Sequence, residues 1–240
     1  MKTRNLLVAG ITTLGLLTSC DDLVTYEQDD IKIVLDEGDE WLHDFPLFAG
    51  IKIKNPPQIA VWIEDMDGKY VTTIYVTHKI ATESWRANDG NRRKEALPAW
   101  CFARGVQYAD GLYLPTKDEQ LVDGISGATP HGSFDVKIRP VGELRQFVVK
   151  IELNHSTDWN DAYPEGAMEG AANYSGGKKG SGQPAVVYSA AVDLDSDRKQ
   201  YTANLIGHSS PDGSNGEISS DLSALTSALN IVKKITINIQ

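Results

Sequence analysis

Cysteine and basic residues are both scarce in this sequence of 240 residues. It contains two Cys, and 23 Lys and Arg stand against 33 Asp and Glu, which gives a formal net charge of −10 at pH 7. Nucleic acid binding needs Lys and Arg that displace counterions from phosphates, so this balance argues against a nucleic acid partner. A chain of this length can also bury a core without disulfides or metals. We therefore expect a protein that is stabilised by packing.

The motifs of several common enzyme classes are missing as well. The five histidines form no pair at i, i+4 and no H-E-x-x-H motif, which argues against a zinc hydrolase. The sequence has no Gly-x-Ser-x-Gly elbow, and Lys178-Lys179 lacks the Gly-Lys-Ser/Thr order of a phosphate-binding loop. Because no nucleophile–base pair can be identified, we expect a noncatalytic protein and assign no catalytic residue.

Two acidic stretches contain residue types that could bind a metal ion. The segment 193–204 begins like a calcium loop, but Arg198 replaces the glycine at position six and Asn204 replaces the glutamate at position twelve. The oxygens of Asp158, Asn160, Asp161 and Glu165, with His155 nearby, could hold Ca²⁺, although their spacing is not diagnostic. The prediction is that the protein has no metal site.

The N-terminus contains the only feature that predicts where the protein resides. Lys2 and Arg4 precede an apolar run from Leu6 to Leu17, and the sequence Leu17-Thr18-Ser19-Cys20 follows. This order is that of an export signal, and its end resembles the lipobox of bacterial lipoproteins, whose cysteine thiol receives a diacylglycerol. The run of about 12 residues is shorter than the ~20 that a membrane-spanning helix needs. We therefore predict a signal peptide at 1–19 and lipidation of Cys20.

The predicted mature protein begins with an acidic tether at 20–30 and continues as a single domain at 31–240. Loss of residues 1–19 removes Lys2 and Arg4 and no acidic residue, so the mature chain is more negative than the whole. The lipid anchor would hold the chain on a membrane of the bacterial cell envelope, in the periplasm or on the outer-membrane surface. Cys101 would then be the only thiol, and its position between Trp100 and Phe102 indicates a small buried hydrophobic residue.

The body of the sequence has the periodicity of strands. Phe147, Val149, Ile151 and Leu153 alternate with other residues, and an Asp67-Gly68 turn separates two strand-like runs. The predicted strands cover 31–35, 59–64, 70–77, 133–138, 146–153, 185–192, 201–206 and 235–239. Helical spacing predicts one or two short helices, at 221–229 and at 91–96, with Pro98 ending the second. This pattern predicts an all-β fold, an immunoglobulin-like β-sandwich.

Two long segments, 163–183 and 207–216, are rich in glycine. Structureless loops of this length are usually functional or disordered, and we expect these two to line one end of the sandwich. Among the five tryptophans, Trp85 and Trp159 have polar neighbours and are the two expected to be exposed. An exposed indole could stack on a sugar or a flavin.

One short motif points toward a cofactor. The sequence Asp123-Gly-Ile-Ser126-Gly127-Ala128-Thr129 resembles the attachment sequence of covalently flavinylated extracytoplasmic proteins, in which a transferase places FMN on the threonine hydroxyl. The resemblance implies covalent FMN on Thr129. The pattern then departs, because Pro130 follows and His131 stands where Ser or Thr is expected. A plain turn that leads into the strand at 133–138 explains the same glycines and is the preferred interpretation.

A wider resemblance covers most of the mature chain. The segments 60–69 (AVWIEDMDGK), 84–86 (SWR) and 126–130 (SGATP) are similar to a family of predicted periplasmic proteins catalogued as domain of unknown function 2271. Its members often accompany flavin transferases and membrane proteins that carry heme or flavin. The resemblance implies an envelope redox protein as a partner. We thus expect an accessory or binding lipoprotein, or alternatively an electron carrier with FMN esterified to Thr129.

Overall fold

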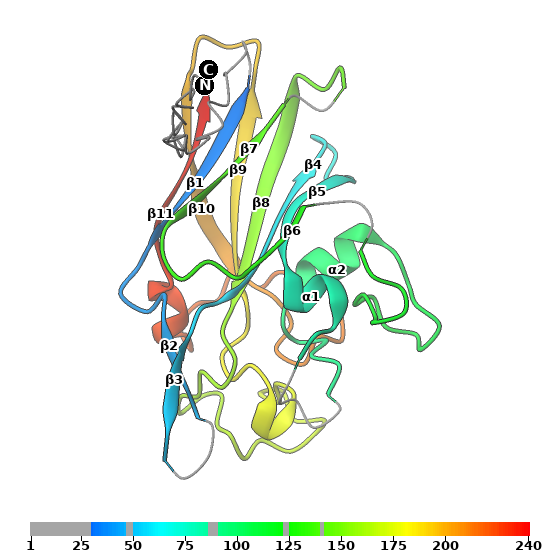
Figure 1. Cartoon of the computed structure of the whole chain (residues 1–240), viewed down its shortest axis with the longest axis vertical. Coiled ribbons are helices and arrows are strands. Elements are labelled where there is room, and N and C mark those ends of the chain that lie inside the picture. Colours follow the sequence, from blue (N-terminus) through cyan, green and yellow to red (C-terminus); the bar gives the residue numbers. More distant parts are fainter. Residues whose placement is uncertain (1–29, 47–49, 86–90, 122–124, 140–141) are drawn as a thin grey trace, which may run out of the picture.

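The computed structural model describes residues 30–46, 50–85, 91–121, 125–139 and 142–240 (Figure 1). Most of these residues belong to one sheet of nine strands, in the order β6-β5-β4-β8-β9-β10-β11-β1-β7, and a separate hairpin is formed by β2 and β3. The strands are β1 (Ile31–Glu37), β2 (His43–Pro46), β3 (Lys52–Asn55), β4 (Gln58–Glu64), β5 (Tyr70–Thr77), β6 (Ile125–Gly127), β7 (Phe134–Ile138), β8 (Gln146–Asn154), β9 (Val186–Asp193), β10 (Gln200–His208) and β11 (Val232–Ile239).

The all-β fold with few short helices is confirmed, and so are the predicted strands. The predicted turn joins β4 to β5, where the Asp65 carboxylate accepts hydrogen bonds from the backbone N–H groups of Asp67 and Lys69. The strands form one continuous sheet, which curls until its two edges approach each other. The Tyr75 ring on β5 lies 5.3 Å from the Phe134 ring on β7, so the two halves of the sheet face each other as in a sandwich.

The sheet carries a hydrophobic layer on each face. The larger core fills the inside of the curl and includes Phe147, Val149 and Ile151 of β8, as their alternation predicts. The second core lies on the outer face, where α1 (His78–Thr82) and α2 (Pro98–Arg104) cover it. The strand β4 is buried along its whole length because it contributes to both cores, which explains its uninterrupted apolar sequence.

Both helix predictions were wrong in position. Residues 91–97 have an irregular backbone with a turn at 94–95, and α2 begins at Pro98 because proline lacks the N–H that a first helical residue leaves unpaired. In the segment 221–229 only a 3₁₀ turn, Ser227–Asn230, is present, and Leu225 packs against the core from an irregular backbone. A second 3₁₀ turn covers Gly177–Lys179. No helix in the described ranges is long and apolar enough to cross a membrane.

The long connections gather at one end of the sheet, as predicted for the two glycine-rich segments. The segment 155–185 links β8 to β9, and 209–231 links β10 to β11. In Figure 1 both lie beyond the lower ends of the long strands, and the segment 155–185 extends to the bottom together with the β2–β3 hairpin. We call this region the loop end. The opposite end contains the start of β1, the end of β11 and the turn between β9 and β10, because Lys32 pairs with Asn238 and Asn238 pairs with Gln200.

Candidate functional site

The residues of the flavin-like motif lie at the edge of the sheet. The short edge strand β6 pairs in parallel with β5, and the chain then turns away through Ala128 and Thr129. Ser126 and Ala128 are exposed, while Gly127 and Thr129 are half-buried. The structure thus brings these four residues together in one short edge segment, whereas Asp123 lies outside the described residues. Cys20 also lies outside them.

Packing explains the glycine and the turn in this motif without a cofactor. A Cβ atom at Gly127 would lie 2.8 Å from the Tyr75 ring, so a larger residue would displace that ring. The Tyr75 hydroxyl donates to the Ala128 carbonyl at 2.9 Å, and the Trp41 indole N–H donates to the Pro130 carbonyl at 3.1 Å. Burial raises the pKa of Tyr75 to about 12, which keeps this phenol a neutral donor. FMN attachment to Thr129 stays a prediction.

The loop end is held in place by a buried ion pair that the sequence analysis missed. Arg93 and Glu95 are only 2% and 1% exposed, and their Nε and Oε1 atoms are 2.7 Å apart. The Arg93 guanidinium also donates to Ser156 at 2.7 Å and to Ser181 at 3.2 Å. These contacts join three segments that are far apart in the sequence, so the loops have a fixed frame. Trp85, which was expected to be exposed, is half-buried with the Arg93 guanidinium 4.8 Å above its ring.

The glycine-rich segment closes on the end of β8 through backbone hydrogen bonds. The Asp158 N–H donates to the Ser181 carbonyl at 2.8 Å, and the Gln183 N–H donates to the Asp158 carbonyl at 2.9 Å. Gly182, between them, has a φ of 81°, and a Cβ atom there would lie 2.3 Å from the Asp158 carbonyl oxygen. Only glycine adopts this positive φ without strain and also leaves room for the carbonyl oxygen. The loop is therefore built by close backbone contact rather than by an apolar core.

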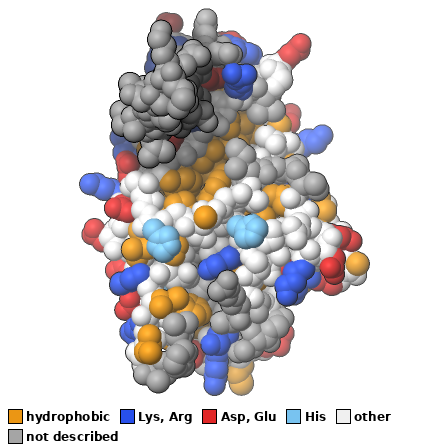
Figure 2. All heavy atoms as spheres, in the orientation of Figure 1, with side chains coloured by type: hydrophobic (Ala, Val, Ile, Leu, Met, Phe, Trp, Pro, Cys, Tyr) orange, Lys and Arg blue, Asp and Glu red, His pale blue; other side chains and the backbone are white. Residues whose placement is uncertain are grey.

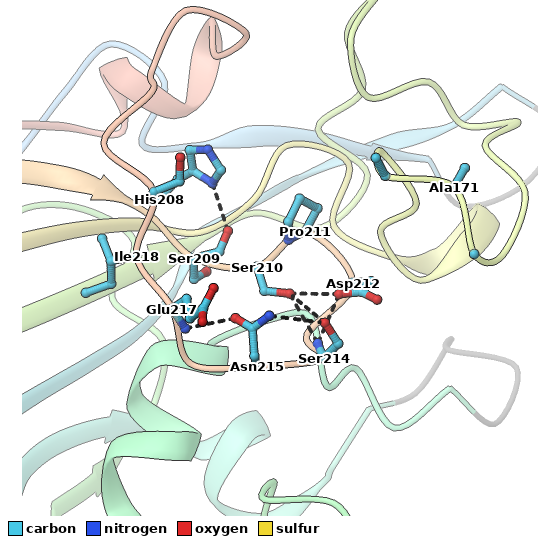
Figure 3. A pocket seen from close by; sticks show the side chains of 13 residues that line it. Ala171, His208, Ser209, Ser210, Pro211, Asp212, Ser214, Asn215, Glu217 and Ile218 are labelled. Carbon is cyan, nitrogen blue, oxygen red and sulfur yellow. Dashed lines mark hydrogen bonds between the residues drawn. The ribbon is translucent and has the colours of Figure 1, made fainter.

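A polar hollow of about 420 Å³ lies between the two glycine-rich segments (Figure 3). Ser210 donates to the Asp212 carboxylate at 2.7 Å, and the Ser214 N–H donates to it at 3.0 Å. Burial alone would raise the pKa of Asp212, but hydrogen bonds from Ser210 and Ser214 outweigh it, so this pKa is lowered. His208 Nδ1 lies 2.8 Å from the Ser209 carbonyl and donates to it, and among the described residues no hydrogen bond joins the His208 ring to a serine hydroxyl.

A second hollow, of about 480 Å³, lies on the other side of the segment 155–185, against the β2–β3 hairpin. It has charged groups of both signs and one indole. Trp159, the other tryptophan expected to be exposed, is half-buried and lines this hollow. The loop end therefore carries two hollows, and the segment 155–185 separates them.

A buried carboxyl group on the outer face of the sheet was also missed. Glu152 is 0% exposed and accepts hydrogen bonds from the backbone N–H groups of Ala99 at 3.2 Å and Trp100 at 2.8 Å, at the start of α2. Desolvation raises its pKa to about 7, although these hydrogen bonds oppose the shift. Cys101, one turn into the same helix, is buried as predicted, and burial raises the pKa of its thiol.

In the acidic segment 155–165, whose oxygens could hold Ca²⁺, several polar groups form hydrogen bonds within the protein. Asp158 accepts a hydrogen bond from Ser227, and Asn160 accepts one from the Tyr163 N–H. His155 is buried, which lowers its pKa to about 3, and its Nε2 donates to the Glu40 carbonyl. Within the part of the chain that the structure describes, no group of three or more His, Cys, Asp or Glu side chains is arranged to hold a metal ion.

Comparison with known proteins adds no relative to this description. No family model, no curated protein and no solved structure matches the chain. The resemblance to the predicted periplasmic family stays a prediction.

Proposed function

We propose that the protein is a noncatalytic, lipid-anchored binding module of the bacterial cell envelope, and that its loop end is the binding face. The observation that carries this proposal is the position of the loops relative to β1. The proposed tether at 20–30 joins the sheet at Ile31, and the loops lie at the opposite end (Figure 1). A chain anchored through Cys20 would therefore present its loop end away from the membrane.

The rigidity of the loop end supports a binding role. The Arg93–Glu95 ion pair and the backbone contacts of Gly182 fix the segment 155–185 between the two hollows. A site that is already ordered loses less conformational entropy when a ligand binds. In the first hollow the Ser210 hydroxyl donates to Asp212, and the His208 ring bonds to a backbone carbonyl rather than to a described serine hydroxyl, which favours binding over catalysis.

The distribution of charge on the protein is consistent with a module whose folded domain does not bind the lipid surface. On the face shown in Figure 2, acidic and basic side chains of the described residues are interspersed around the rim. The whole chain has a net charge of −10, which disfavours adsorption to anionic headgroups. The partner that best fits the sequence resemblance is a redox protein of the same envelope, for which this chain would be an accessory.

The anchoring part of the proposal is tested by replacing Cys20. In cells labelled with radioactive palmitate, the wild-type protein should carry the label and sediment with membranes. The Cys20→Ser variant should lose both properties, whereas Cys101→Ser, which alters a buried thiol, should keep them. Membrane retention of unlabelled Cys20→Ser protein would refute the anchor.

A second function, an electron carrier with FMN on Thr129, is favoured by the position of this half-buried residue at the edge of the sheet, next to exposed Ala128. A transferase could reach this turn, and the FMN would supply the electron-transfer chemistry. Co-expression with a flavin transferase tests the idea. A yellow protein with the mass of one FMN adduct, lost in Thr129→Ala and kept in Ser126→Ala, would establish the carrier. A colourless protein of unmodified mass would exclude it.

A further inference from the structure

We infer that the second hollow, between the β2–β3 hairpin and the segment 157–178, binds a neutral saccharide whose ring packs on Trp159. This inference rests on the proposed binding role and names the ligand class of one site. The volume of about 480 Å³ lies within the ~300–1,000 Å³ typical of small-ligand sites. Three properties of the lining residues lead to this ligand class: an available indole, an unpaired buried hydroxyl and a balance of charges.

Trp159 differs from the other tryptophans in its surroundings. Trp41, Trp62 and Trp100 are at most 1% exposed and belong to the cores, and Trp85 lies beneath the Arg93 guanidinium. Trp159 is half-buried, and it lines a hollow whose other walls combine charged and polar residues with Leu42 and Pro46. An indole offers a flat apolar face and one N–H donor. A sugar ring has the complementary surface, with C–H groups on one face and hydroxyls around its edge.

Thr157 provides the second observation. This residue lines the hollow and is 5% exposed, and its buried Oγ1 has no hydrogen-bond partner among the described residues. Such an unpaired buried hydroxyl destabilises the fold, because it has lost its hydrogen bonds to water without gaining one in the protein. Its backbone φ is 61°, which is an outlier for a β-branched residue. Backbone strain of this kind persists only where neighbouring contacts impose it, and it concentrates at ligand sites.

The surrounding contacts show how this conformation is imposed. The Thr157 N–H donates to the Gly180 carbonyl at 2.8 Å, and His43 Nε2 lies 3.2 Å from the Thr157 carbonyl. The residue is thereby fixed from the glycine-rich segment on one side and from β2 on the other. Oγ1 has almost no accessible surface, so a ligand hydroxyl that displaced the atoms covering it would supply the hydrogen bond that this oxygen lacks.

The charges of the hollow select against a strongly charged ligand. Its lining contains three lysines and three acidic residues, so its formal charge is balanced. Lys54 and Lys52 lie 2.7 and 3.8 Å from the Asp44 carboxylate. A net anion or cation would meet a like charge on one wall. Sugar hydroxyls both donate and accept, so they can bond to ammonium and carboxylate groups at once.

The experiment uses the full chain, purified in a detergent without a sugar headgroup. Cellobiose, maltose and chitobiose serve as probes and are titrated to millimolar concentrations while tryptophan fluorescence and saturation-transfer NMR are recorded. We expect at least one disaccharide to bind and to change the fluorescence. Trp159→Ala should weaken that binding about tenfold, the equivalent of one 1.4 kcal/mol interaction. Asp212→Asn, in the other hollow, is the matched control and should bind like the wild type.

Thr157→Gly separates a binding role from a structural one. Glycine accepts the left-handed backbone without strain and removes the hydroxyl. The variant should therefore unfold at the same or a higher temperature than the wild type and yet bind the disaccharide more weakly. A variant that is less stable and binds normally would contradict the inference.

The remaining outcomes distinguish this inference from the proposed function. If none of the three disaccharides binds, the saccharide assignment is wrong, and the palmitate and fractionation results still decide the proposed function separately. If a disaccharide binds and Asp212→Asn abolishes the binding while Trp159→Ala does not, this site is wrong although a binding module remains.

Discussion

Ionisation of Glu152 should make the stability of this protein depend on pH. The carboxyl group lies between the outer face of the sheet and the start of α2, with no exposed surface. Its pKa rises from an ordinary value of 4.5 to about 7 because burial penalises the charged form more than the N–H groups of Ala99 and Trp100 stabilise it. The folded protein therefore holds this proton at pH values where the unfolded chain releases it.

The sign and size of the effect follow from the two pKa values. A raised acid pKa stabilises the fold fully below pH 4.5, and this contribution is lost as the pH rises to about 7. One pKa unit corresponds to about 1.4 kcal/mol, so the free energy of unfolding should fall by about 3 kcal/mol across this window through Glu152 alone. Above pH 7 the contribution should stay constant.

A matched variant isolates this contribution from the other titrating groups. Glu152→Gln keeps the shape of the side chain and one acceptor oxygen but does not ionise. Urea unfolding of both proteins between pH 4 and 8 gives the difference in their unfolding free energies. Relative to Glu152→Gln, the wild type should lose about 3 kcal/mol as the pH rises, by the linkage between pKa and stability. A difference that is independent of pH would refute the buried, desolvated state of this carboxyl.

Three further predictions concern the frame of the loop end and the buried thiol. Arg93→Met leaves Glu95 buried without its charge partner and should lower the free energy of unfolding by about 3–5 kcal/mol in urea titrations; a loss below about 1 kcal/mol would contradict the buried pair. Gly182→Ala introduces a Cβ next to a backbone carbonyl and should cost more than about 2 kcal/mol, whereas Gly166→Ala, in open space, should stay within about 0.5 kcal/mol. In the lipidated protein Cys101 should react with a thiol reagent only after unfolding, because burial keeps it protonated; rapid reaction of the native protein would show that it is accessible.

Local patterns in the sequence were sufficient to predict eight of the eleven strands in the described residues, and the three short strands β2, β3 and β6 were missed. The alternation in β8 and the Asp-Gly turn between β4 and β5 depend on neighbouring residues, and both were predicted correctly. The pairing of β1 with β7 and β11 joins residues about a hundred or more positions apart, and no local pattern encodes it. The curl that merges the two halves into one sheet was therefore beyond reach from the sequence.

The failed helix predictions have a common cause. Apolar residues at helical spacing indicate which side chains are buried, but an irregular segment can bury them equally well, as Leu225 does. Pro98 was taken as the end of a helix, although proline is equally suited to begin one.

The loop end was only partly accessible from the sequence. The glycine content correctly predicted that the two long loops share one end, whereas the polar neighbours of Trp159 predicted exposure and the residue is half-buried at a hollow. The contacts that fix the loop end were not predictable, because Arg93 forms hydrogen bonds with Ser156 and Ser181, which are 63 and 88 positions away in the sequence. The burial of Glu152 could not be predicted for a different reason. Strand alternation places its side chain on the face of β8 opposite the core residues, and a charged residue on that face is usually expected to be exposed.

The central claim is that the loop end faces away from an anchoring membrane, and a distance measurement tests it directly. Met168, in the loop end, is 79% exposed, and Asp197, in the turn between β9 and β10, lies at the tether end. The nine residues of β10 alone separate the two ends by roughly 25 Å at about 3.3 Å per residue. Fluorophores attached to Met168→Cys and Asp197→Cys in vesicle-bound, lipidated protein are compared by using a quencher on the lipid headgroups. The account predicts stronger quenching at position 197, and equal or stronger quenching at position 168 would contradict it.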